Sequence, residues 1–143
     1  MGKNQFIKMN KIIQIDKIML KINEFPVINE NSILKEALEE MNKYNLGIVC
    51  IINNQNKLLG VITDGDIRRK LLKVQKPFSA LLVDDALIYS IKKPITVKSD
   101  DTLQKCVEIM GRKQIWDLPV INANENLVGL LHLHPAVKEL LKN

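Results

Sequence analysis

The sequence predicts an α+β fold made of two β-α-β-β-α units related by pseudo-twofold symmetry, with the sheets packed together and the helices outside. Shifting the 143-residue chain by 69 positions places residues 37–53 on 106–122 and residues 56–62 on 125–131. The matched segments share apolar periodicity, asparagine-rich turns and glycine, as an internal repeat does. One such unit buries too little surface to be stable alone, so we expect the two to share a core.

The first element of each unit is a short extended segment, residues 25–29 and 93–98. Phe25 and Lys93 each precede a proline, which disfavours a helical conformation in the residue before it. A helix follows in each unit, because apolar residues recur there with helical spacing. These residues are Leu34, Ala37, Leu38 and Met41 in the first unit, and Leu103, Cys106, Val107 and Met110 in the second.

Polar residues of the kind that cap helices precede both sets of helically spaced apolar residues. Asn31 or Ser32 is predicted to cap the first helix. In the second unit, Asp101 and Gln104 have the spacing of a capping box. Both helices are therefore predicted to begin close to the first apolar residue of their stripe.

Two strands joined by an asparagine-rich turn follow each helix, and this pattern is typical of a hairpin. The paired segments are residues 47–52 and 58–63 in the first unit, and residues 117–122 and 127–133 in the second. Their apolar runs are nearly continuous, which indicates sheets covered on both faces. A last helix, "DIRRKLL" or "AVKELLK", closes each unit.

The repeat divides the chain into four parts. They are an N-terminal extension (1–14), a first repeat (15–75), a linker (76–92) and a second repeat (93–142). The linker has a mixed pattern that favours no particular element.

Composition limits the classes of partner. The net charge is +5, but the lysines are scattered and aromatic residues make up only 4%, so we expect no nucleic-acid partner. No apolar run approaches the length of a membrane span, and the N-terminus lacks the pattern of a secretory signal. Cys50 and Cys106 lie inside apolar patterns and predict buried thiols in a reducing compartment. We therefore expect a cytoplasmic protein without a membrane partner.

The most unusual stretch is "GVITDGDIRR", residues 60–69, where a buried strand is predicted to end and a helix to begin. The hydroxyl of Thr63 and the first amides of that helix are suited to a phosphate. The carboxylate of Asp66 is suited to the two hydroxyls of a ribose. Gly65 leaves room for a ligand to approach the backbone. The stretch therefore predicts a nucleotide site.

Neighbouring residues extend this site, and other interpretations compete with it. Arg68 or Arg69 adds charge-assisted contacts to phosphate, and Asp64 completes the set. One alternative is that Asp66 merely caps the helix. A metal site built on the two aspartates, as in glycosyltransferases or phosphotransferases, needs a larger domain than this chain provides. No catalytic residue, no metal ligand and no required cofactor is predicted.

The segment "LLGVITDGDIRR" after an asparagine-rich hairpin, with a second copy at "LPVINANENLVGLL", resembles a tandem CBS-domain pair, or Bateman module. The resemblance covers about residues 15–142. It implies a nucleotide site at Thr63 and Asp66. The second copy departs from the pattern, because His132 stands in place of Thr63 and Pro135 in place of Asp66. One main nucleotide site is therefore expected.

The resemblance also implies that the start of a strand in the partner repeat lines the site. Here that stretch is "QIWDLPV", which adds Trp116, Leu118 and Pro119. Trp116 is either a stacking partner for a base or plain interface packing. His132 is expected to line the cleft, and His134 to pack elsewhere or to be exposed.

The chain is most similar to the CBS portion of arabinose 5-phosphate isomerases of lipopolysaccharide sugar synthesis, or of CBS-fused sugar-nucleotide transferases. This implies a regulatory module without catalysis of its own, attached to or associated with such an enzyme. The implied effector is an adenine or cytidine nucleotide or a CMP-sugar. It also implies a homodimer formed through helix faces around Leu34, Leu38, Leu103 and Val107. The alternative is a ligand-free dimerisation module.

Overall fold

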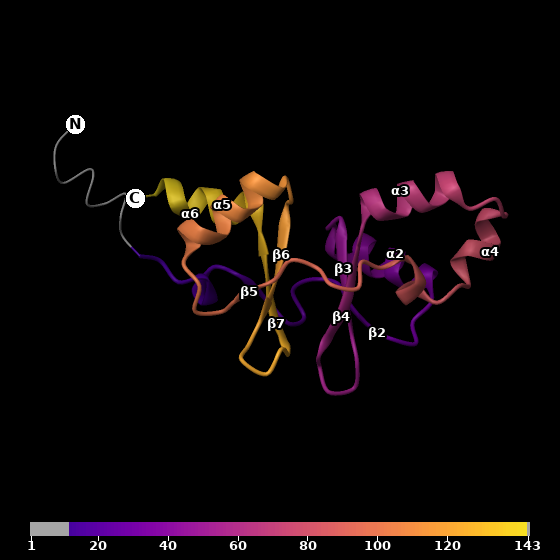
Figure 1. Ribbon diagram of the computed structural model, residues 1–143, viewed down its shortest axis with the longest axis horizontal. Coiled ribbons are helices and arrows are strands. Elements are labelled where there is room, and N and C mark those ends of the chain that lie inside the picture. Colours follow the sequence, from indigo (N-terminus) through magenta and orange to yellow (C-terminus); the bar gives the residue numbers. More distant parts are fainter. Residues whose placement is uncertain (1–11, 143) are drawn as a thin grey trace.

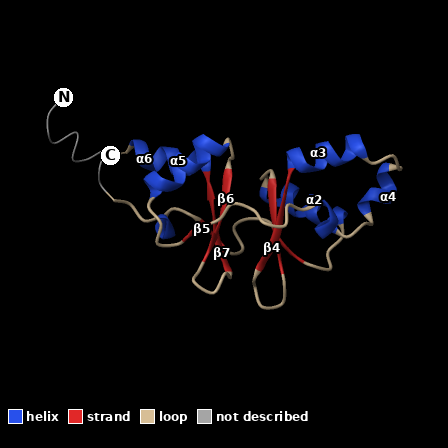
Figure 2. Ribbon diagram, viewed as in Figure 1, coloured by secondary structure: helices blue, strands red, loops and turns tan. Residues whose placement is uncertain are grey.

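Two sheets lie side by side with the helices on their outer sides in a computed structural model that describes residues 12–142 (Figures 1 and 2). The first sheet has the strand order β2-β3-β4, and the second has the order β1-β7-β6-β5. The predicted α+β class with two repeated units is thereby confirmed. Residues 1–11, most of the predicted N-terminal extension, lie outside the described residues.

The two repeats have the same element order. The first repeat contains β2 (Val27–Asn29), α2 (Leu34–Tyr44), β3 (Ile48–Ile52), β4 (Leu58–Thr63) and α3 (Asp64–Lys73). The second contains β5 (Val97–Lys98), α5 (Leu103–Lys113), β6 (Asp117–Ile121), β7 (Leu127–His132) and α6 (Leu133–Leu141). The remaining elements are η1 (Ile15–Lys17), β1 (Leu20–Lys21), α4 (Phe78–Leu82) and η2 (Ala86–Tyr89). The last two lie in the predicted linker.

The first predicted helix cap is wrong. Helix α2 begins at Leu34, and the residue before it, Ile33, donates its N–H to Glu36 Oε1 at 3.1 Å. Asn31 and Ser32 lie outside the helix, in a turn held by the side chain of Asn29. The chain becomes helical only after this turn, so neither residue reaches the free amides of α2.

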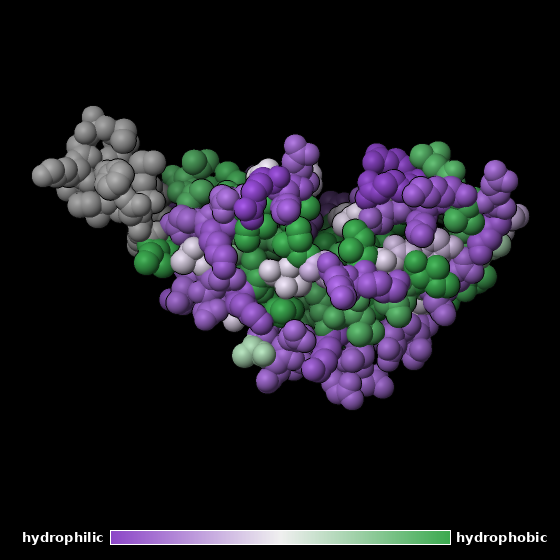
Figure 3. All heavy atoms as spheres, viewed as in Figure 1, coloured by the Kyte–Doolittle hydropathy of each residue, from purple (hydrophilic) through white to green (hydrophobic). Residues whose placement is uncertain are grey.

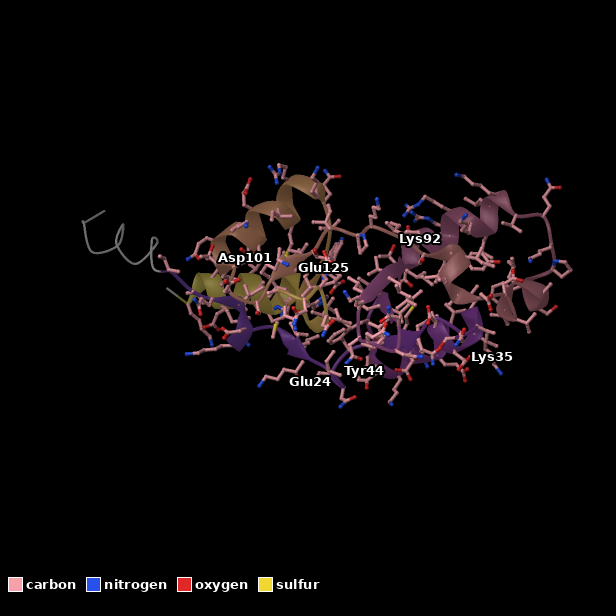
Figure 4. All side chains as sticks on the ribbon, turned by 60° about the horizontal axis from the view of Figure 1, so that its bottom comes forward. Glu24, Lys35, Tyr44, Lys92, Asp101 and Glu125 are labelled. Carbon is pink, nitrogen blue, oxygen red and sulfur yellow. The ribbon has the colours of Figure 1, made fainter. Side chains whose placement is uncertain are left out.

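The second predicted cap is also wrong. Thr102 caps α5, and its Oγ1 accepts the N–H of Lys105 at 3.2 Å. Asp101, labelled in Figure 4, instead accepts the N–H of Lys98 at 2.8 Å. Its Oδ2 closes the turn between β5 and α5, and its Oδ1 accepts from Lys105 Nζ at 3.1 Å, so Asp101 does not cap the backbone of the helix.

The shared core lies between the two sheets. Its buried members come from both repeats and are Phe25, Ile48, Cys50, Val61, Leu127 and Leu130. Each repeat has a further core between its own sheet and helices. Burial of apolar surface between the sheets is the main force that holds the repeats together.

The helix stripes do not provide the predicted dimer surface. Leu34 is 2% exposed and Leu103 is fully buried, because each faces the sheet of its own repeat. Leu38 and Val107 are partly buried against the same cores. A homodimer stays a prediction, and Leu34 and Leu103 are too deeply buried to contribute to its interface.

The segments that precede β2 and β5 each contact the sheet of the other half of the molecule. Strand β1, which precedes β2, pairs antiparallel with β7 of the second repeat, with Lys21 opposite Gly129. Ile91 of the linker forms an antiparallel bridge to Val61 of β4. A Cβ on Gly129 would lie 2.8 Å from the carbonyl oxygen of Leu20, and a Cβ on Gly60 would lie 2.9 Å from that of Ile91. The repeated glycine therefore makes room for these crossing segments.

Burial makes both cysteine thiols chemically inert in the folded chain. Cys50 and Cys106 are fully buried. Burial raises the pKa of Cys106 to about 11, and burial followed by the nearby Asp117 carboxylate raises the pKa of Cys50 further. Because the thiolate is the reactive form, we expect no reaction with a disulfide reagent at about pH 8 in the native protein. Both thiols should react in guanidinium, and rapid labelling of the native protein would contradict this burial.

Candidate functional site

A cavity of about 760 Å³ lies between the repeats. The space-filling surface is notched between the parts that carry α5 and α3 (Figure 3). Eight of the nine predicted site residues line the cavity, namely Thr63, Asp64, Gly65, Asp66, Arg68, Trp116, Pro119 and His132. These eight residues come from both repeats and lie around one cavity.

The ninth residue, Leu118, does not line the cavity. It is fully buried in the core between the second sheet and its helices. Successive side chains of a strand point to opposite faces, so Asp117 and Pro119 of β6 face the cavity while Leu118 faces the helices.

Sequence reasoning missed several lining residues. The most informative are Lys93 at the start of the second repeat and Asp117 at the start of β6. Both stand where the repeat loses its symmetry, because Lys93 corresponds to Phe25 and Asp117 corresponds to Ile48. A comparison of charge between the two copies is a signal that would have found them.

Thr63 and Asp66 form a capping box at the end of β4. Thr63 Oγ1 accepts the N–H of Asp66 at 3.3 Å and donates to Asp66 Oδ2 at 2.9 Å. The same Oδ2 accepts the N–H of Thr63 at 2.9 Å. Helix α3 begins at Asp64, so Thr63 is the N-cap and Asp66 is the third helical residue. The hydroxyl predicted to meet a phosphate is therefore held by its own helix.

The second oxygen of Asp66 has a partner that can leave. Oδ1 accepts from Arg69 Nη2 at 2.9 Å, and the side chain of Arg69 is 57% exposed while that of Asp66 is 9% exposed. An exposed guanidinium loses little when it turns toward another anion. Ribose hydroxyls would therefore compete with Arg69 for this one oxygen.

Gly47 and Trp116 occupy equivalent positions in the two repeats and make the rim asymmetric. The Gly47 carbonyl accepts the N–H of Asp64 at 3.1 Å, and the Trp116 carbonyl accepts the N–H of Leu133 at 2.8 Å. Gly47 gives the first repeat no side chain there, and a Cβ would lie 2.6 Å from Asp64 Oδ2, which would have to move. Trp116 is 69% exposed, and its indole is free to stack on a planar group.

Asp117 and His132 form a pair across the end of the β6–β7 hairpin. They are register partners, and Asp117 Oδ1 lies 2.7 Å from His132 Nδ1. Burial raises the pKa of the Asp117 carboxyl, and the bond to His132 opposes that rise. Because β7 ends at His132, the two histidines do not share a strand: His132 lines the cavity, and His134 is exposed in the first turn of α6.

The cavity carries charges of both signs. Arg68, Arg69 and Lys93 are cationic, while Asp64, Asp66 and Asp117 supply carboxylates. Phosphates suit the first group and sugar hydroxyls suit the second. Across residues 12–142, no cluster of three or more metal-ligating side chains is found, and no helix is long and apolar enough to cross a membrane.

A match to a known family accounts for this arrangement. The sequence model described as CBS domain matches residues 15–73 and 83–134. The chain belongs to the CBS domain family. As a CBS pair, it is a module of a type that is generally regulatory, ligand-binding and non-catalytic.

Solved structures share the fold of this CBS pair. The crystal structure of CBSX2 in complex with AMP superposes with a TM-score of 0.78 at 20% identity, covering 90% of this chain and 96% of that one. The CBS domains of a transcriptional regulator from Streptococcus pneumoniae give a TM-score of 0.77 at 16% identity, covering 90% and 99%.

Curated relatives are much longer than this CBS pair. An uncharacterized protein of Helicobacter pylori is 31% identical over 99% of this chain and 40% of its own length. The arabinose 5-phosphate isomerase KdsD of Francisella tularensis is 26% identical over 89% of this chain and 37% of its own. The chain thus spans about two fifths of the length of the relatives it matches.

Proposed function

We propose that this CBS pair is a regulatory module that binds a nucleotide or nucleotide-sugar in the cavity between its repeats. The observation that carries the proposal is the placement of a carboxylate, three cationic side chains and an exposed indole around one cavity. A nucleotide has one group suited to each: ribose hydroxyls, phosphates and a planar base. The neighbour CBSX2, which is crystallised with AMP, has the same fold.

The contacts divide among the elements that line the cavity. The base stacks on Trp116 at the rim. The ribose hydroxyls donate to Asp66 Oδ1 once Arg69 turns away, since Oδ2 is already held by Thr63. The freed Arg69 then joins Arg68 and Lys93 at the phosphates. This replaces the predicted role of the Thr63 hydroxyl as the phosphate ligand.

The proposed target of regulation is a sugar-phosphate isomerase or a sugar-nucleotide transferase. Support comes from the similarity to KdsD of Francisella tularensis and to a probable arabinose 5-phosphate isomerase of Haemophilus influenzae, 32% identical over 74% of this chain. Both relatives extend well beyond the matched region. A CMP-sugar is among the proposed effectors. We also propose that the protein forms a homodimer, acts in lipopolysaccharide synthesis and is located in the cytoplasm.

A ligand-free dimerisation module is the second candidate. The observation that favours it is that both carboxylate oxygens of Asp66 are already bonded within the chain. In that case Asp66 would serve only to stabilise the start of α3. Nucleotide titration of wild type and one variant separates the two candidates.

We expect calorimetry to detect binding of at least one of AMP, ATP, CMP and a CMP-linked acid sugar. Asp66→Asn should weaken that binding by about 10- to 100-fold, because it removes a charged acceptor of ribose hydroxyls. Asparagine is preferred to alanine because its oxygen still accepts the N–H of Thr63 and preserves the cap. Asp100→Asn, at an exposed aspartate outside the cavity, is the control. The ligand-free candidate predicts no heat from any nucleotide, or equal affinity in all three proteins.

A further inference from the structure

His132 is held by the protein through only one of its ring nitrogens. Nδ1 lies 2.7 Å from Asp117 Oδ1, and across residues 12–142 no hydrogen bond involves Nε2. His132 precedes α6 without capping it, whereas its counterpart Thr63 uses its hydroxyl to cap α3. The side chain is 28% exposed and lines the cavity. The second repeat thus offers a polar atom that no structural role occupies.

Asp117 decides what Nε2 can do. An ionised carboxylate keeps the proton on Nδ1, so Nε2 of the neutral ring is an acceptor and Nε2 of the protonated ring is a donor. The Asp117 side chain is 10% exposed, and burial disfavours its charge unless a cation stands beside it. Protonation of His132 therefore gives the buried carboxylate a partner and turns Nε2 into a charged donor.

Other charged and titratable groups also face this pair. The thiol of Cys50 on β3 is close enough for Asp117 to affect its pKa. Across the cavity, α3 contributes Asp64, Asp66, Arg68 and Arg69, and the start of the second repeat contributes Lys93. The bases suit an anion at any pH near neutral, so a proton on His132 adds to a charge pattern that already suits an anionic ligand.

We propose that His132, oriented by Asp117, is a proton-dependent anchor for the phosphate of the bound nucleotide, so that acid strengthens binding. This inference rests on the proposed function. The sign follows from the chemistry: imidazolium Nε2–H donates a charge-assisted bond to phosphate, and the neutral ring, with its proton on Nδ1, cannot. The second repeat lost the carboxylate of the first at Pro135, and in this arrangement it contributes a cation to the same ligand.

The test is calorimetry with AMP at about pH 5.5 and about pH 7.5, which bracket the usual range of histidine. A phosphate monoester itself loses charge in this range, so the informative quantity is the change relative to a variant. We expect the affinity ratio between the two pH values to be about five-fold more in favour of acid in wild type than in His132→Asn. His134→Asn is the matched control, because this exposed histidine does not line the cavity, and it should behave as wild type.

Two further arms isolate the anion and the orienting residue. Adenosine, which lacks the phosphate, should show no difference in pH dependence between wild type and His132→Asn. Asp117→Asn should reduce the pH effect on AMP without abolishing AMP binding, because it removes the charge that favours imidazolium. Affinity that depends on Asp66 but shows the same pH ratio in wild type and His132→Asn overturns this inference and leaves the proposed function intact. No heat from any nucleotide at either pH overturns both.

Discussion

Replacing Phe25 with alanine is expected to lower the free energy of unfolding by about 3 to 5 kcal/mol. Phe25 is 1% exposed and packs in the core between the two sheets. Its removal leaves a cavity lined by both repeats, which rigid sheets cannot close. Urea denaturation followed by circular dichroism would show a lower midpoint with little change in slope.

Phe78→Ala is the matched control for this prediction. Phe78 lies at the start of α4 and is 54% exposed. Its truncation should cost less than about 1 kcal/mol, because most of the ring already meets solvent. Equal losses in the two variants would contradict a core shared between the sheets.

Replacing Gly129 with alanine should cost about 1 to 3 kcal/mol, the usual range for overpacking. The new Cβ would lie 2.8 Å from the backbone oxygen of Leu20, a contact that side-chain rotation cannot relieve. Strand β1 has to move away from β7, which weakens their pairing. Hydrogen exchange at the amides of β1 should then rise together with the loss measured by denaturation.

Gly111→Ala provides a control of opposite sign. Gly111 lies in α5, and a Cβ there would meet nothing within 4 Å. Alanine favours helix over glycine by up to about 1 kcal/mol, so this variant should be more stable than wild type. A similar loss of stability in both variants would show that Gly129 is not needed to make room for β1.

The repeat made most of the fold predictable, because two copies of one apolar pattern specify the same elements twice. Strand β1 was not predictable in the same way. It has only two residues and therefore no periodicity, and its partner β7 lies at the other end of the chain. The helix caps failed for a different, local reason: the side chains of Asn29 and Asp101 bond to nearby backbone in turns that precede the helices, so the residues of these turns do not cap them.

The part of the site that lies in one short motif could be predicted from the sequence. The part that depends on how distant segments pack together could not. The segment from Thr63 to Asp66 places strand end, helix start and carboxylate together by covalent proximity. Leu118 lies in the stretch that predicts the cavity lining, but alternate residues of a strand face opposite sides, and Leu118 faces the core. The contact between Asp117 and His132 depends on hairpin register, which the turn length between β6 and β7 helps to fix.

The crossing segments also bear on how the chain folds. The second sheet takes its edge strand β1 from the start of the first repeat, and the first sheet is bridged by the linker that precedes the second repeat. The core between the sheets needs both of them, so a ribosome that has released only the first repeat holds an incomplete domain. Contacts as distant in sequence as Leu20 with Leu130 form late and slowly. Once these contacts have formed, each half of the molecule stabilises the other. Loss of β1 from the first half would expose the edge of the sheet in the second half.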